Sequence, residues 1–530
     1  MIRIDGKQII GFDASAAGSE KLFSRKAATG ELLAHQFFKA TESEVNAACE
    51  KAATAFQVFR KKSGIEKAVF LEAIATELVA LGSELITVCC LETALPEVRI
   101  EAERNRTVNQ LLMFAGLLRE GSWVDARIET GDASRNPLPK PDIRYMHVGL
   151  GPVVVFGASN FPLAFSVAGG DTAAAFAAGC PVIVKAHSAH PTTGEFVGKA
   201  IRRAAEKTHM PDGVFSMLHG EGTVTGMQLV RHVHVKSVAI TGSFTAGKAL
   251  FDAACRRDVP IPVYAEMGST NPVFILPEAL RINKETIAKG FAASVTLGVG
   301  QFCTNPGLLL YEESNESEAF TQLLKREFEH TSGGPMLTAG ILGAYEKGTA
   351  RYAVHEGIQV LACGKQSTTE NCAHPVLFRT TAEVFAGHQE LSEEIFGPAS
   401  MVIETASKDE ILSVASGLSG HLTATVHGTE RDLASYRDLL DILEQKVGRI
   451  VINGFPTGVE VCHAMVHGGP YPSTTDGRST SVGTASIFRF TRAVCYQNMP
   501  SALLPAELQN ENPLNIWRLI NGLQTKERVL

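Results

Sequence analysis

Residues 152–240 alternate short, mostly apolar segments with longer segments of helical character. The apolar segments are Pro152–Phe156, Pro181–Lys185, Val214–Leu218 and Val235–Ile240. Strands that are apolar along their length, rather than at alternate residues, are typical of a parallel sheet that helices cover on both faces. The pattern predicts an α/β fold with a doubly wound parallel sheet. Ligands of such sheets bind beyond the carboxyl ends of the strands.

The chain has 530 residues, which is more than one hydrophobic core usually serves. A second alternating α/β block follows the first. A polar segment with a proline cluster, together with a strand expected over Ile487–Phe490, indicates a small β arm. The predicted division is a first α/β domain over 1–125 and 147–270, a second over 271–483, the arm over 126–146 and 484–500, and a C-terminal tail over 501–530.

Composition narrows the classes of partner. With a net charge of −7, the chain lacks the excess of basic residues that is typical of a nucleic-acid-binding protein. Charges in Met1–Lys7 stand where a signal peptide has its apolar run, and no window approaches the ~20 apolar residues of a membrane span. The ten cysteines are scattered, without a CxxC pair or a zinc-type ligand spacing. We therefore expect a cytoplasmic protein with free thiols, no metal site and no nucleic-acid or membrane partner.

Cys303 is the strongest candidate for a nucleophile. It lies in the uncharged, glycine-bounded segment Gly300–Gly307, and Glu266 ends a strand-like run roughly thirty-five residues earlier. A thiol can attack a carbonyl carbon, and a carboxylate can later take a proton from water. Taken singly, Cys303 is equally well a buried structural thiol, and Glu266 a solvated strand end.

Three further polar features follow predicted strands. Asn160 follows the first strand and can donate to an oxyanion, although a loop Asn more often satisfies turn backbone. Lys185 ends the second strand and faces either solvent or a ligand. Gly242 and Ser243 open a helix after a strand, where backbone N–H groups favour a phosphate. This turn is not the G-x-G-x-x-G fingerprint, so a plain strand–helix turn is an equally good interpretation.

In order, the motifs resemble those of the aldehyde dehydrogenase superfamily, over about residues 5 to 500. They are Asn160–Pro162, Lys185, Ile240–Ser243, Glu266–Gly268, Gly300–Cys303 and Glu393–Pro398. The resemblance implies that the first domain binds a dinucleotide, that the second is catalytic, and that the arm serves a homodimer or homotetramer. It also implies oxidation of an aldehyde to a carboxylic acid by NADP or NAD, through a cysteine thiohemiacetal and thioester.

The resemblance assigns roles residue by residue. Cys303 matches the nucleophile, Glu266 the general base and Asn160 the oxyanion donor, with the Cys303 N–H as the second donor. The matching cofactor-binding residues are Lys185, Ser188, Gly242, Ser243, Glu394 and Phe396. Ser188 departs from the family pattern, because NAD-preferring members commonly carry Glu at this position. A Glu repels a 2′-phosphate whereas Ser can donate to one, so we expect NADP to be accommodated and NAD not to be excluded.

Several segments are similar to one branch, the α-ketoglutaric semialdehyde (2,5-dioxovalerate) dehydrogenases. They are Gln301–Gly307, Val461–Pro472 and Asn512–Arg518. The expected substrate is therefore α-ketoglutaric semialdehyde, whose carboxylate needs a cation. The residues predicted to contact the substrate are Arg104, Arg106, Phe161 and His463. His463 and His467 lie in a loop that the family places near the substrate mouth, and either can equally be a surface His.

Three alternatives stay open at this point. The same branch includes NADP-dependent enzymes for long-chain or broad-range aldehydes, which need an apolar tunnel. A cofactor-independent thiol esterase would use Cys303 and Glu266 but would leave Lys185 and Glu394 without a purpose. A non-catalytic scaffold would be marked by loss of the nucleophile or the base, and both are present.

Overall fold

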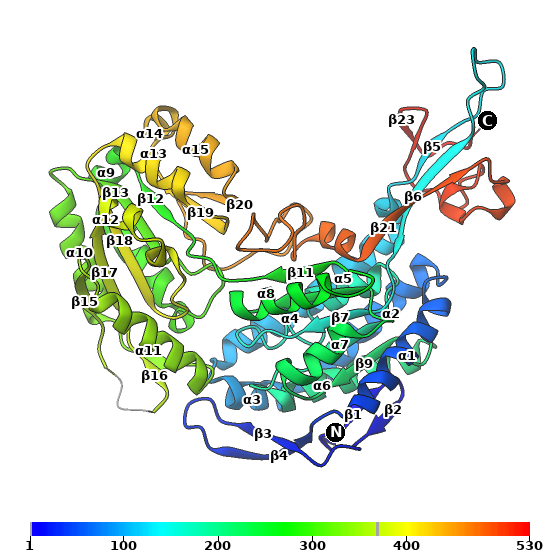
Figure 1. Cartoon of the computed structure of the whole chain (residues 1–530), viewed down its shortest axis with the longest axis horizontal. Coiled ribbons are helices and arrows are strands. Elements are labelled where there is room, and N and C mark those ends of the chain that lie inside the picture. The colour runs from blue at the N-terminus through cyan, green and yellow to red at the C-terminus, as the bar shows by residue number, and fades with distance from the viewer. Residues whose placement is uncertain (1–2, 367–369, 530) are drawn as a thin grey trace.

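The computed structural model describes residues 3–366 and 370–529, so the ends of the predicted first domain and tail, and part of the second domain, lie outside the described residues. Two large sheets stand side by side, and a narrow arm projects from one of them (Figure 1). In the described part of the chain no single helix is long and apolar enough to cross a membrane. The helices α2 (Gly64–Ala80) and α3 (Gly82–Thr93) reach the length and apolar composition of a membrane span only when they are taken together, and they meet at an angle of 77°.

The first sheet has the strand order β11-β10-β7-β8-β9-β1-β2. Its strands are β1 Gln8–Ile10, β2 Asp13–Ser15, β7 Val153–Phe156, β8 Val182–Lys185, β9 Phe215–Leu218, β10 Ser237–Thr241 and β11 Val263–Glu266. Strands β7 to β11 are parallel, and β1 joins β9 antiparallel. The doubly wound parallel sheet predicted from the sequence is confirmed.

Helices bury both faces of this sheet. Side chains of β7 alternate between them: Val153 and Val155 join one core and Val154 the other. The first core is completed by α2, α4 (Glu97–Glu120), α5 (Gly170–Ala177) and α6 (Pro191–Lys207), and the second by α1 (Glu42–Phe59), α7 (Met227–Arg231) and α8 (Phe244–Cys255). Burial on both faces is why these strands lack polar alternation.

The second sheet has the order β15-β17-β18-β13-β12-β19-β20, and only the β15–β17 pair is antiparallel among its described pairs. Its strands are β12 Val273–Ile275, β13 Leu308–Glu312, β15 Gln359–Cys363, β17 Val376–Thr381, β18 Ala399–Thr405, β19 His421–His427 and β20 Val447–Ile452. Its longer helices are α9 Pro277–Thr296, α10 Ser317–His330, α11 Ala339–Ala353 and α13 Lys408–Gly417. Two short helices, α14 (Glu430–Ser435) and α15 (Arg437–Glu444), follow β19 and are separated at Tyr436.

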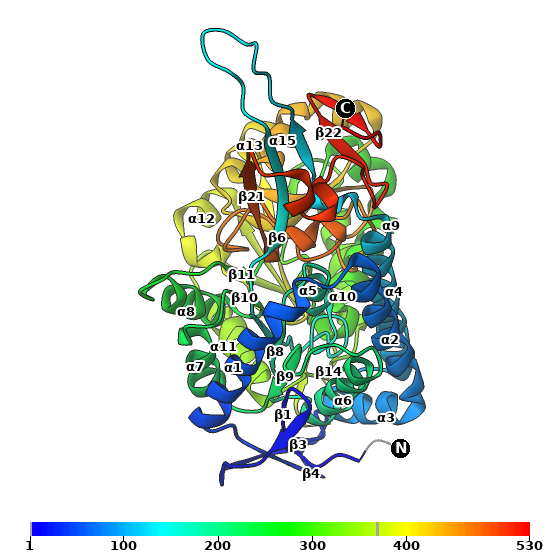
Figure 2. The same ribbon diagram turned by 90° about the vertical axis from the view of Figure 1, so that its right-hand side faces the viewer.

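The arm carries a five-stranded sheet in the order β21-β6-β5-β22-β23. These strands are β5 Arg127–Glu129, β6 Ile143–Gly149, β21 Thr491–Gln497, β22 Arg518–Ile520 and β23 Leu523–Thr525. The tail thus supplies two strands of this sheet: β22 pairs with β5, and β23 pairs with β22. Figure 2 shows β22 in red near the C-terminus. The strand expected over 487–490 is wrong: residues Thr484–Phe490 form a 3₁₀ turn, and the strand starts at Thr491. In a 3₁₀ turn residues three apart share a face, which lets Ile487 and Phe490 both enter the first core.

Candidate active site

The loop that carries Cys303 leaves α9 through a left-handed turn. Gly298, Val299 and Gly300 all have φ between 55° and 66°. A Cβ on Gly300 would lie 2.3 Å from the backbone of Gly397, so only glycine fits this close approach. The approach brings the Glu393–Pro398 segment against the nucleophile loop.

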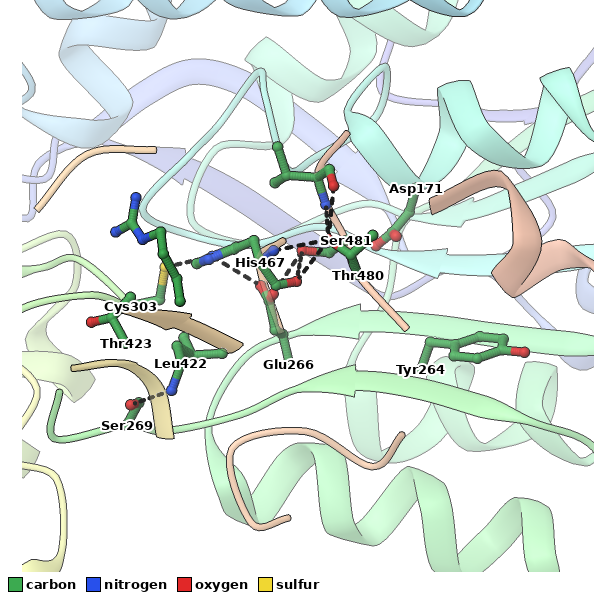
Figure 3. Close-up of polar contacts among 12 residues, drawn as sticks. Asp171, Tyr264, Glu266, Ser269, Cys303, Leu422, Thr423, His467, Thr480 and Ser481 are labelled. Carbon is green, nitrogen blue, oxygen red and sulfur yellow. Dashed lines mark hydrogen bonds and ion pairs between the residues drawn. The ribbon is translucent and has the colours of Figure 1, made fainter. Parts of the chain in front are cut away.

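Cys303 faces a buried histidine and a buried glutamate (Figure 3). Its Sγ lies 3.3 Å from Nε2 of His467, and the same Nε2 lies 3.5 Å from Oε2 of Glu266. The other Glu266 oxygen, Oε1, accepts a 2.6 Å hydrogen bond from the Ser481 hydroxyl. Four side chains that are remote in sequence therefore form one contiguous cluster.

Burial determines which side chains of this cluster are protonated near neutral pH. Desolvation raises the pKa of Glu266 to about 7, although the Ser481 hydrogen bond lowers it. Burial and the nearby carboxylates of Glu266 and Glu394 raise the pKa of the Cys303 thiol, so the thiol is protonated at neutral pH. Burial lowers the pKa of His467 to about 3, so the imidazole is neutral. Glu266 is therefore the member of this cluster that gains or loses a proton near neutral pH.

Asn160 and Phe161 flank the nucleophile loop. The Asn160 side chain is buried, and its Nδ2 donates to the carbonyl of Gln301 at 3.0 Å. A side-chain amide has two N–H groups, so one remains for an oxygen on a ligand. The Phe161 ring packs edge-on against Phe302, with ring centroids 5.6 Å apart.

The two arginines predicted to contact the substrate point in different directions. Residues two apart on a helix do not share a face. The Arg106 guanidinium lies 5.6 and 5.3 Å from the ring centroids of Phe161 and Phe165, and its Nε and Nη2 are buried without a hydrogen-bond partner. Arg104 instead donates to the carbonyl of Gly82 at 3.2 Å and faces α3. Of these two arginines, Arg106 is thus the one that lies toward the Cys303 loop.

His463 also lies apart from the cluster around Cys303. It is exposed, and its Nδ1 lies 3.2 Å from the hydroxyl of Thr484. His467, four residues later in the same loop, makes the contact with Cys303.

A cleft of about 1070 Å³ runs along the carboxyl edge of the first sheet, and Ser188 lines it. Lys185 is 7% exposed at the end of β8, and its ammonium has no hydrogen-bond or ion-pair partner within the described residues. Burial lowers its pKa to about 8. Ser243 caps α8 by accepting from the N–H of Ala246. A buried unpaired cation and a helix N-terminus beside one cleft fit an anionic dinucleotide.

Two backbone contacts tie this edge to the cluster around Cys303. The N–H of Gly242 donates to the carbonyl of Glu266 at 2.9 Å. A Cβ on Gly268 would come within 2.6 Å of Oε2 of Glu394, so the Glu394 carboxyl packs directly on the strand-end glycine. Burial raises the pKa of Glu394 to about 8, although the Ser269 backbone N–H lowers it. Glu394 and Phe396 border one small cavity together.

The sequence profile of the aldehyde dehydrogenase family matches residues 15–493. The chain belongs to the aldehyde dehydrogenase family. The enzyme is 48% identical to a protein named alpha-ketoglutaric semialdehyde dehydrogenase 2 from Azospirillum brasilense, over 98% of this chain and 99% of the relative. It is 43% identical to the alpha-ketoglutaric semialdehyde dehydrogenase of Acinetobacter baylyi, with the same coverage of both chains.

Solved structures share the fold of this aldehyde dehydrogenase. A 3,6-anhydro-L-galactose dehydrogenase in complex with NAP superposes with a TM-score of 0.79 at 22% identity, covering 93% of this chain and 99% of that one. An aldehyde dehydrogenase from Bacillus cereus in complex with NAD+ also has a TM-score of 0.79 at 22% identity, covering 93% and 96%. The predicted membership of the family is confirmed.

Sequence reasoning missed the roles of His467 and Ser481 in this aldehyde dehydrogenase. Both lie in the long loop between β20 and the arm, whose residues have no strand or helix pattern to orient them. The histidine was visible as one of two in the loop, but nothing in their spacing distinguishes them. Ser481 had no sequence signal, since its importance comes from a hydrogen bond to Glu266 across 215 residues.

The electrostatics of the cluster predict how Cys303 reacts with iodoacetamide. Negative neighbours raise the pKa of the thiol, so Glu266→Gln and Glu394→Gln should each move the alkylation profile to lower pH. The measurement is the rate of modification of the Cys303 peptide against pH, followed by mass spectrometry. Glu285→Gln, on an exposed face of α9, is the matched control and should leave the profile unchanged. A profile that moves in neither active-site variant would contradict this account of the thiol.

Proposed function

We propose that this enzyme oxidises α-ketoglutaric semialdehyde to α-ketoglutarate. The observation that carries the proposal is Arg106, a half-buried guanidinium with two nitrogens that lack a hydrogen-bond partner, packed on the aromatic cluster beside Cys303. A buried cation without a partner is costly, and a substrate carboxylate removes that cost by a charge-assisted bidentate contact. The names of the two relatives above 40% identity support the same substrate.

The chain's own groups account for the steps on the substrate. The Cys303 sulfur attacks the aldehyde carbon, and the free N–H of Asn160 and the Cys303 backbone N–H stabilise the oxyanion. The chemistry that a bound NAD(P)+ would supply is acceptance of the hydride from that carbon, and an acyl thioester would then remain on Cys303. Glu266 then removes a proton from water, which attacks the thioester and releases the acid.

The pKa values decide which group takes the thiol proton. Glu266, at about 7, is far more basic than His467, at about 3, so Glu266 receives the proton directly or through water. We assign the His467 tautomer that carries hydrogen on Nε2, because that N–H can be shared by the Cys303 sulfur and the Glu266 carboxylate. His467 is then a positioning group that favours the thiolate. Because the ionised carboxylate is the base, turnover should rise as pH increases through about 7.

A long-chain aldehyde is the second candidate substrate. The surroundings of Arg106 are apolar: Phe161, Phe165 and Phe302 pack together, and Val459, Val461 and Met465 pack against this cluster. An alkyl tail would gain from such a wall by the hydrophobic effect. Arg106 favours the acidic substrate, because its buried nitrogens would stay unpaired beside an alkyl chain.

The residues that would bind the cofactor fit NADP+ as well as NAD+. Lys185, Ser188, Gly242 and Ser243 would hold the adenosine and phosphate end, and Glu394 and Phe396 the nicotinamide end. Ser188 is exposed in the cleft and carries no charge that would repel a 2′-phosphate. A homodimer or homotetramer built through the arm, and a cytoplasmic location, stay predictions.

Replacing Arg106 should separate the two substrates. Arg106→Met should lower kcat/KM for α-ketoglutaric semialdehyde by about 10- to 100-fold, the loss of one charge-assisted contact. Pentanal, which lacks the carboxylate, should lose less than about threefold, since it never used that contact. Initial rates with both aldehydes measure the split.

Arg104→Met is the matched control for this experiment, since Arg104 lies on the same helix but faces α3. It should change neither rate. An equal loss for both aldehydes in Arg106→Met, or a selective loss in Arg104→Met, would remove the basis for an acidic substrate bound at Arg106.

The cofactor assignment makes a second prediction. Ser188→Glu places a carboxylate in the cleft, so kcat/KM for NADP+ should fall about tenfold or more while that for NAD+ changes little. Initial rates with each cofactor test this. Wild type with a strong preference for NAD+, or an equal loss for both cofactors, would show that the adenosine ribose does not lie against Ser188.

A further inference from the structure

A carboxylate, that of Glu221, lines the same cleft as Ser188, in the loop that follows the neighbouring strand. Strands β8 and β9 are parallel, with Lys185 paired in register to Leu218. Ser188 lies three residues beyond the end of β8, and Glu221 lies three residues beyond the end of β9. Both residues line the cleft. The negative charge that is missing at position 188 is therefore present at another position of the same cleft lining.

Lys39 neutralises this carboxylate. Its Nζ lies 2.5 Å from Oε1 of Glu221 and 3.0 Å from Oε2 of Glu20. Lys39 and Glu221 line the cleft, whereas Glu20 does not. The Lys39 side chain is 25% exposed and that of Glu221 is 56% exposed, so both charges are accessible to a ligand in the cleft.

The backbone holds Lys39 in place. It follows strand β4 (Leu32–Phe38), which pairs with β3 (Lys21–Arg25) at the same end of the molecule as β9 (Figure 2). The Lys39 N–H donates to the carbonyl of Glu20, and the next N–H, of Ala40, donates to the carbonyl of His219 just past β9, both at 2.8 Å. The N-terminal hairpin is thus fastened to the loop that carries Glu221.

We propose that the Lys39–Glu221 ion pair is the element that sets 2′-phosphate discrimination in this enzyme. With NADP+, Lys39 turns from Glu221 toward the phosphate and at the same time shields it from the carboxylate. With NAD+, Glu221 accepts hydrogen bonds from the ribose hydroxyls, the role that a carboxylate has in many dinucleotide sites. The pair lets one cleft take both cofactors. This inference rests on the proposed function, in that the adenosine ribose must lie in this cleft.

The opposite charges of Lys39 and Glu221 explain why neither residue alone determines how well the cleft binds a 2′-phosphate. An unpaired Glu221 would repel a phosphate that carries nearly two negative charges, whereas an unpaired Lys39 would attract it. Both groups are partly exposed, so salt weakens the effect, and the discrimination should decrease as ionic strength rises.

The test is binding of two fragments by isothermal titration calorimetry at low salt, followed by kinetics with the whole cofactors. The fragments are 2′,5′-ADP and 5′-AMP, which carry the adenosine end with and without the 2′-phosphate. Lys39→Met should weaken binding of 2′,5′-ADP about tenfold or more and binding of 5′-AMP by less than about threefold. Only 2′,5′-ADP has a 2′-phosphate, which the Glu221 carboxylate would repel once Lys39 is gone. Removing that carboxylate as well, in Lys39→Met/Glu221→Gln, should return 2′,5′-ADP to within about threefold of wild type.

Glu20→Gln is the matched control, because Glu20 also pairs with Lys39 but lies outside the cleft lining. It should leave the ratio of the two Kd values unchanged. If Lys39→Met weakens binding of both fragments equally, or if the double variant does not recover binding of 2′,5′-ADP, the inference is overturned. Binding of both fragments by the wild type would still support a nucleotide site in this cleft. A wild type that binds neither fragment would overturn the nucleotide site and this inference together.

Discussion

The removal of water from Glu266 and Cys303 is the constraint on which the rest of the site depends. Burial raises the pKa of Glu266 from 4.5 to about 7, which corresponds to roughly 3 kcal/mol of unfavourable ionisation. A fold accepts such a cost only where the surrounding structure fixes the group. The same burial keeps the thiol protonated and His467 neutral, so Glu266 is the member of the cluster that titrates near neutral pH.

This buried site forms where the end of a strand of the first sheet contacts a loop of the second sheet. Glu266 ends β11 of the first sheet, and the loop that follows β20 of the second sheet lies against it. Met267 N–H donates to the carbonyl of Ser473, and Glu266 forms an isolated antiparallel bridge with Thr474. Ser481, further along this loop, then reaches the Glu266 carboxylate. The Glu266 carboxylate is therefore held from both sides. Gly300 lets the Cys303 loop approach Gly397, and Gly268 lets the Glu394 carboxyl pack two residues after Glu266.

Features that depend on local pattern could be predicted from the sequence. The apolar strands of the first sheet, and the positions of Cys303, Glu266 and Asn160 at loop edges, follow from periodicity and from motif order. Features that depend on long-range contacts could not. Nothing local distinguishes His467 from His463, and the strand expected at 487–490 failed because tertiary burial of Ile487 and Phe490 favours a 3₁₀ turn. The directions of Arg104 and Arg106 follow from helix geometry, but which one faces Cys303 depends on how α4 packs.

The most direct test of the account is the fate of the acyl group when the base is removed. In Glu266→Gln, mixing with NADP+ and α-ketoglutaric semialdehyde should give a burst of about one NADPH per active site, slower than in wild type because the thiol proton loses its acceptor. Still slower turnover should follow, because hydrolysis of the thioester loses its base. Mass spectrometry of the stopped reaction should find the acyl group on Cys303. Absence of both burst and adduct, in a variant that still binds NADP+, would contradict the account, since Glu266 would then act mainly in forming the thiolate.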